Sequence, residues 1–125
     1  GDPHGHQGDG EVCGTAIETS AEIEVRIRLL KEKYHMPVVT GQIQDSGRRL
    51  CTSGIGNDLY GASRDAVLSM IHILEGKNLS PEESYILMSV AGNLSIREIV
   101  DEPNFVVNMC MDLSILEKAG IYFDL

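Results

Sequence analysis

Hydrophobic and polar residues alternate with a period of two between positions 17 and 29 of the chain. The odd positions of this stretch carry mainly Ile, Val and Leu, whereas the even positions carry mainly Glu and Arg. This alternation predicts a long amphipathic strand with one buried face. Two further stretches, 38–44 and 48–53, flank Asp45-Ser46-Gly47, and a three-residue connection that ends in glycine predicts a hairpin.

The spacing of apolar residues then changes from two to three or four, which predicts a helix. Apolar residues at this spacing cover positions 59–74. Asn57 or Asp58 stands where an N-cap is needed, and Gly76 is placed to end the helix.

A second helix is predicted from an unusually complete start signal. Ser80 is the expected N-cap, Pro81 the first helical residue, and Glu83 completes a capping box. Gly92 marks the end of this helix. The stretch 95–98 repeats the capping-box pattern, so we expect one more short helical turn there.

Alternation returns over positions 105–112, which predicts a final strand. The expected fold is therefore α+β, with antiparallel strands and two helices inserted before the last strand. The chain has 125 residues, the length of one domain, and we expect a single domain over 1–125 with no internal boundary.

Charge and hydropathy exclude several classes of partner. Lys and Arg number 10 and Asp and Glu number 19, so the net charge is −9. A chain this acidic is repelled by a phosphate backbone, and we expect no nucleic-acid partner. No apolar run approaches the roughly 18 residues of a membrane span, and we expect no membrane partner.

Three cysteines, Cys13, Cys51 and Cys110, are far apart in the sequence and form no Cys-x-x-Cys pair. This spacing offers no disulfide framework and predicts free thiols in a reducing compartment. We therefore expect a cytoplasmic protein. Cys51 and Cys110 lie within strand patterns and are predicted to be core residues.

Candidate chemistry is concentrated in the glycine-rich run GDPHGHQGDGEVCG at positions 1–14. His4 and His6 point to the same side of an extended segment, a workable spacing for zinc, and Asp2 is the carboxylate predicted to complete the ligand set. A bound metal would turn water into a hydroxide nucleophile, and a nearby carboxylate would act as general base. The alternative interpretation is a flexible polar loop without a metal.

The longer run GDPHGHQGDGEVCGTAIE resembles the acetamidase/formamidase family. The family pattern, Asp-x-His-x-x-Gln-Gly-Asp-Gly-Glu-x-x-Gly-Thr-Ala-Ile-Glu, falls on Asp2, His4, Gln7, Gly8, Asp9, Gly10, Glu11, Gly14, Thr15, Ala16, Ile17 and Glu18. Three later stretches, 52–67, 80–104 and 105–111, are also similar to the family and follow its order. The resemblance therefore extends over nearly the whole chain.

The resemblance implies hydrolysis of short carboxamides, formamide or acetamide, to a carboxylate and ammonia. His4, Asp9 and Glu11 occupy family positions and are the implied ligand or base residues. Gln7 is implied to polarise or orient the amide carbonyl, and Glu18 to point into the site. A metal such as zinc is associated with some members, so metal-assisted attack by water is the expected mechanism.

Two departures from the family lead to further expectations. His6 stands where the family usually has a small or apolar residue. Family enzymes are also more than twice as long, and this chain corresponds to their C-terminal portion. The alternative function is therefore a catalytically incomplete or silent domain that serves a longer chain as a structural or metal-binding partner. We also expect a homo-oligomer, or association with the N-terminal portion, because the predicted strand face needs a cover.

Overall fold

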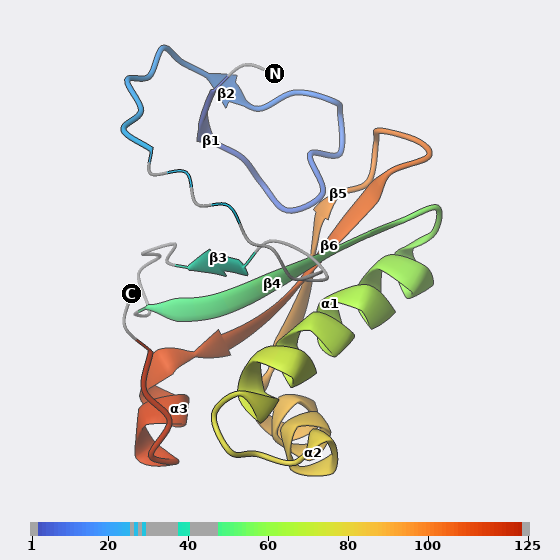
Figure 1. Ribbon diagram of the computed structural model, residues 1–125. Helices are drawn as coiled ribbons and strands as arrows, with labels where there is room; N and C mark the ends of the chain where they lie inside the picture. The colour runs from blue at the N-terminus through green and yellow to red at the C-terminus, as the bar shows by residue number, and fades with distance from the viewer. Residues whose placement is uncertain (1–2, 26, 28, 30–37, 41–47, 124–125) are drawn as a thin grey trace.

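The computed structural model describes residues 3–25, 27, 29, 38–40 and 48–123. Within these residues the chain forms two antiparallel sheets and three helices, which confirms the α+β class (Figure 1). The predicted hairpin turn at 45–47 and the candidate ligand Asp2 lie outside the described residues. No helix in the described part of the chain is long and apolar enough to cross a membrane.

The larger sheet has the strand order β3-β4-β6-β5, with every neighbouring pair antiparallel. These strands are β3 (Val38–Thr40), β4 (Arg49–Gly56), β5 (Asn93–Glu98) and β6 (Phe105–Asp112). The antiparallel pairing of β3 with β4 is the one that the predicted hairpin requires. The final strand was also predicted, and β6 occupies its positions.

Helix α1 (Leu59–Glu75) begins and ends where the sequence indicates. The Asp58 carboxylate accepts a hydrogen bond of 2.8 Å from the backbone N–H of Gly61, so Asp58 is the N-cap. Gly76 follows the last helical residue.

Helix α2 (Pro81–Ala91) has the capping box that was predicted for it. The Glu83 N–H donates to the Ser80 hydroxyl at 3.1 Å, and the Ser80 N–H donates to the Glu83 carboxylate at 2.9 Å. The backbone N–H groups of Ser80 and Glu83 are thereby satisfied. Gly92 follows the last turn of the helix.

Helix α1 packs directly on one face of the sheet, over β4 and β6 (Figure 1). The approach is close because Gly54 has no side chain: a Cβ there would overlap the carbonyl oxygen of Ala62. Next to it, the buried Thr52 hydroxyl donates to the carbonyl oxygen of Ala66 at 2.7 Å. The core between helices and sheet comprises Leu50, Ala66, Met70, Leu74, Met88, Met109, Met111, Leu113, Leu116 and Ile121.

The predicted long strand at 17–29 is the largest difference between sequence and structure. Among its described residues, only β2 (Ile17–Glu18) pairs, with β1 (His4–His6), and the apolar side chains that follow are exposed. Ile27, for example, is 90% exposed. A strand forms only where a neighbour takes its backbone hydrogen bonds and a layer covers its apolar face. After Thr19, whose N–H donates to the carbonyl oxygen of Pro3 at 2.9 Å, the described residues provide neither a partner strand nor a covering layer for this stretch.

The prediction of a helical turn at 95–98 is wrong, because this stretch lies in β5. Pairing with β6 satisfies its backbone, and the Glu98 carboxylate instead accepts from the backbone N–H groups of Val100 and Asp101. The short helix α3 (Leu113–Lys118) was not predicted. Its N-cap position holds Asp112, a residue type that often caps helices, but the side chain makes no capping hydrogen bond here.

Candidate functional site

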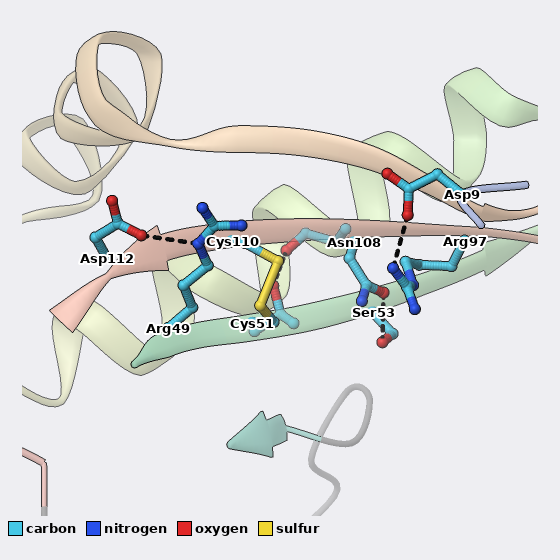
Figure 2. Close-up of a disulfide and its surroundings, with 10 residues drawn as sticks. Asp9, Arg49, Cys51, Ser53, Arg97, Asn108, Cys110 and Asp112 are labelled. Atoms are coloured by element: carbon cyan, nitrogen blue, oxygen red, sulfur yellow. Dashed lines mark hydrogen bonds and ion pairs between the residues drawn. A yellow bond between two sulfur atoms is a disulfide. The ribbon is translucent and has the colours of Figure 1, made fainter. Parts of the chain in front are cut away.

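The face of the large sheet opposite α1 carries polar side chains in place of a second apolar layer. Three successive cross-strand pairs of β4 and β6 are linked there (Figure 2). Arg49 Nε lies 2.8 Å from Asp112 Oδ1, Cys51 is bonded to Cys110, and Ser53 Oγ donates to Asn108 Oδ1 at 2.8 Å. We call these six residues the linked pairs. Side chains that alternate along both strands produce this arrangement, because directly opposed residues share a face.

The disulfide corrects the prediction that the cysteines are free thiols. Cys51 and Cys110 are 59 positions apart in sequence but directly opposed in the sheet, with their Cα atoms 4.1 Å apart. Sequence spacing does not reveal this neighbourhood, which depends on the register of β4 and β6. Cys13 is exposed and free. The cysteine pattern therefore carries no argument for a reducing compartment.

Three contacts fasten the glycine-rich motif loop, residues 3–14, to the end of β5. Arg97 Nη1 donates to Asp9 Oδ1 at 2.7 Å, and Gln7 Nε2 donates to the carbonyl oxygen of Arg97 at 2.9 Å. The Ile99 N–H donates to the carbonyl oxygen of Gly10 at 3.1 Å. Arg97 lies at an irregularity in the pairing of β5 with β6, where the register shifts between Ile96 and Glu98. A bulge of this kind redirects a side chain.

A cavity of about 90 Å³ lies between the motif loop and the linked pairs. Asp9, Arg49 and Arg97 supply its charges, Asn93, Ser95 and Asn108 its neutral polar groups, and Cys51 and Cys110 complete the lining. Arg49 is paired with Asp112 and Arg97 with Asp9, so these four charges sum to zero. The cavity therefore offers hydrogen-bond donors and acceptors without a net charge.

The predicted site residues are brought together in part. His4 and His6 lie on β1, where His4 faces Glu18 across the β1·β2 pair, and all three are exposed. His4 Nδ1 lies 2.8 Å from Gln7 Oε1, so a chain of polar contacts runs from His4 through Gln7 and Arg97 to Asp9.

Glu11 lies in a tight turn of the motif loop. Its φ of 48° is left-handed, its N–H donates to Gly8 O at 3.2 Å, and its carbonyl accepts from the Gly14 N–H at 2.7 Å. Its side chain is partly buried. Among the described residues, no three His, Cys, Asp or Glu side chains are placed to hold one metal ion. The predicted zinc site also includes Asp2, which lies outside these residues, so it stays a prediction.

Sequence reasoning missed Arg97, which holds the motif loop through both its side chain and its carbonyl group. Its position in the stretch 95–98 was interpreted as part of a capping box. No sequence signal identifies its partners, because Gln7 and Asp9 are 90 and 88 positions away.

The chain belongs to the acetamidase/formamidase family, whose pattern it matches over residues 1–118. No curated protein matches the sequence. The family match covers the motif loop, both sheets and the three helices described above.

Solved structures give the same assignment. An acetamidase from Bacillus halodurans has a TM-score of 0.72 and 26% identity, over 94% of this chain and 39% of its own. A predicted acetamidase/formamidase from Thermoanaerobacter tengcongensis has a TM-score of 0.69 and 28% identity, over 96% and 38%. An acetamidase from Yersinia enterocolitica, at 21% identity and a TM-score of 0.63, shares the fold over 90% and 33%. The chain thus spans less than two-fifths of the length of these proteins.

Proposed function

We propose that this chain takes part in the hydrolysis of short carboxamides, formamide or acetamide, to a carboxylate and ammonia. Family membership supports this activity, as do the names of the similar structures. The observation that carries the proposal is the position of the motif loop. Two of its polar residues, Gln7 and Asp9, are hydrogen-bonded to Arg97, and Asp9 lines a polar cavity.

The cavity suits a small neutral amide. A water molecule occupies about 30 Å³ in the liquid, so a space of about 90 Å³ holds a molecule of one or two carbons. An amide presents an acceptor oxygen and two N–H donors, and the cavity lining provides complementary groups. Asn108 is an example: Ser53 occupies its oxygen, which leaves its amide N–H groups to donate to a carbonyl.

In the proposed reaction a water molecule loses a proton to a carboxylate and its oxygen bonds to the amide carbon. The C–N bond then breaks as the nitrogen takes up that proton, and ammonia leaves. We assign the base to Glu11 on the strength of its family position, because the other carboxylate of the loop, Asp9, is already bound by Arg97. Glu11 is not among the described residues that line the cavity, so this assignment requires its side chain to turn towards the bound amide. The predicted zinc is a separate proposal, and no step here depends on it.

The experiment is ammonia release from formamide and acetamide by the purified chain, in zinc-supplied and chelated samples. We expect turnover that falls about 100-fold or more in Glu11→Gln, the size of effect typical for a lost general base. Glu117→Gln, at an exposed position of helix α3, is the matched control and should keep full activity. Equal activity of Glu11→Gln and Glu117→Gln would reject Glu11 as the base. Metal content measured on the same samples decides the zinc proposal separately.

The alternative is a silent domain that packs against another polypeptide, either a second copy or a longer chain. The exposed apolar side chains of Ile23, Val25, Ile27 and Leu29 support it, because a row of this kind is suited to burial in an interface. The same assay separates the two functions. A folded chain that releases no ammonia with or without zinc supports the silent domain and rejects hydrolysis by the chain alone.

A further inference from the structure

We propose that Gln7 and Arg97 are positioning residues that hold His4 as its Nδ1–H tautomer and leave His4 Nε2 as the acceptor nitrogen of the motif loop. The hydrogen-bond geometry carries this inference. Its catalytic meaning rests on the proposed amide hydrolysis.

The first step is the orientation of the Gln7 amide group. A backbone carbonyl oxygen can only accept a hydrogen bond, so the Gln7 atom 2.9 Å from the Arg97 oxygen must be the nitrogen, Nε2. The opposite end of the amide, Oε1, therefore points towards His4. The sheet thus fixes which end of the Gln7 side chain the imidazole meets.

The second step is the proton on His4. Gln7 Oε1 carries no hydrogen and lies 2.8 Å from His4 Nδ1, so the nitrogen must donate. A neutral imidazole has one N–H, and its Nε2 then keeps a free electron pair. A free histidine side chain in water prefers the other tautomer. One such hydrogen bond shifts the tautomer ratio about fivefold, the factor that corresponds to a net contribution of about 1 kcal/mol.

The third step is that two groups of Arg97, its backbone carbonyl and its guanidinium, hold different residues of the loop. Its carbonyl group orients Gln7 and hence His4, whereas its guanidinium group holds Asp9 at 2.7 Å. The Ile99 N–H, which donates to Gly10 O, keeps the loop attached independently of the Arg97 side chain. A change confined to the Arg97 side chain should therefore release Asp9 but leave the His4 tautomer in place.

The test is long-range ¹⁵N–¹H correlation NMR of the imidazoles, in alkaline buffer where they are neutral. The His4 signals are assigned from their loss in His4→Gln. We expect the ratio of Nδ1–H to Nε2–H tautomer of His4 to be about fivefold higher in the wild type than in Gln7→Leu. Asp9→Asn and Arg97→Met should leave the pattern unchanged, because neither removes the Gln7 oxygen or the Arg97 carbonyl.

A ratio of Nδ1–H to Nε2–H tautomer that is no higher in the wild type than in Gln7→Leu would overturn the proposal. The NMR measurement needs no substrate, so a chain that releases no ammonia can still show the higher share of the Nδ1–H tautomer. Conversely, an active chain whose His4 tautomer ratio equals that of Gln7→Leu would reject this inference and leave the proposed hydrolysis standing.

Discussion

Two regions of the molecule differ in how much of their chain is buried and in how many candidate site residues they carry. The helix–sheet unit, residues 48–123, contains the hydrophobic core and all three helices of the described chain. The motif segment, residues 3–25, carries most of the candidate chemistry but only one buried residue, Gly10. The comparison indicates that the unit supplies stability, whereas the segment relies on a few polar contacts to that unit for its position.

The Arg97–Asp9 ion pair illustrates how small those contacts are in energy. The Asp9 side chain is 60% exposed, and exposed pairs contribute about 0–1 kcal/mol. Such a contact fixes where a carboxylate lies without adding much to folding. We therefore expect substitutions in the helix–sheet unit to change the free energy of unfolding and matched substitutions in the N-terminal half to leave it nearly unchanged.

The largest expected effect is the loss of the disulfide in the helix–sheet unit. Replacing both Cys51 and Cys110 by Ser should lower the free energy of unfolding by about 4 kcal/mol, because the bond closes a loop of 59 positions. Urea unfolding of the variant and of the oxidised and reduced wild type would measure this loss.

Cys13→Ser is the matched control from the motif segment and should change stability by less than about 0.5 kcal/mol, since Cys13 is exposed. Thiol titration of the unfolded, unreduced wild type should detect Cys13 and neither of the other two cysteines. Detection of all three would contradict the disulfide and remove the basis of this prediction.

The sequence predicted the helix–sheet unit well where the signals are local. The Asp58 cap and the Ser80–Glu83 capping box each join residues three positions apart, so the pattern contains both partners. β5 and α3 were not predicted, because the contacts that these stretches make join residues far apart in the sequence. Pairing with β6 overrides a capping-box pattern at 95–98, and Asp112, at the start of α3, is paired with Arg49, 63 positions earlier.

The roles of the predicted site residues stay predictions, and of these residues only Asp9 is among the described residues that line the cavity. Resemblance to the family identified His4, Gln7, Asp9, Glu11 and Glu18, because a motif of consecutive residues is visible in one sequence. Hydrogen bonds that span almost the whole chain are not visible there, so the role of Arg97 had no signal. The alternation at 17–29 failed for the same reason, since a period of two does not say whether a partner strand is present.

The second effect compares two leucines. Leu50→Ala should lower the free energy of unfolding by about 3 kcal/mol, because Leu50 is completely buried in the core and its loss leaves a cavity. Leu29→Ala removes the same atoms from a side chain that is 86% exposed, and we expect less than about 0.5 kcal/mol.

Urea unfolding measures both leucine variants under one set of conditions. A loss of 2 kcal/mol or more in Leu29→Ala, a value of about the size seen for buried leucines, would break the comparison. It would mean that the apolar row at 17–29 is covered in solution, as the silent-domain alternative requires. Sedimentation of the same sample at several concentrations would then show whether a second copy provides the cover.

The smallest of the three effects compares two glycines. Gly54→Ala should cost about 2 kcal/mol, because the added methyl group would overlap Ala62 O and lie 2.5 Å from Ala66 N, and backbone atoms of α1 cannot rotate away. Helix and sheet must separate to make room, which also weakens the Thr52–Ala66 hydrogen bond. Gly8→Ala adds the same methyl group in open space and should cost less than about 0.5 kcal/mol. Equal unfolding free energies for the two variants would mean that α1 does not depend on this close approach, and the contrast between the regions would then rest on the core alone.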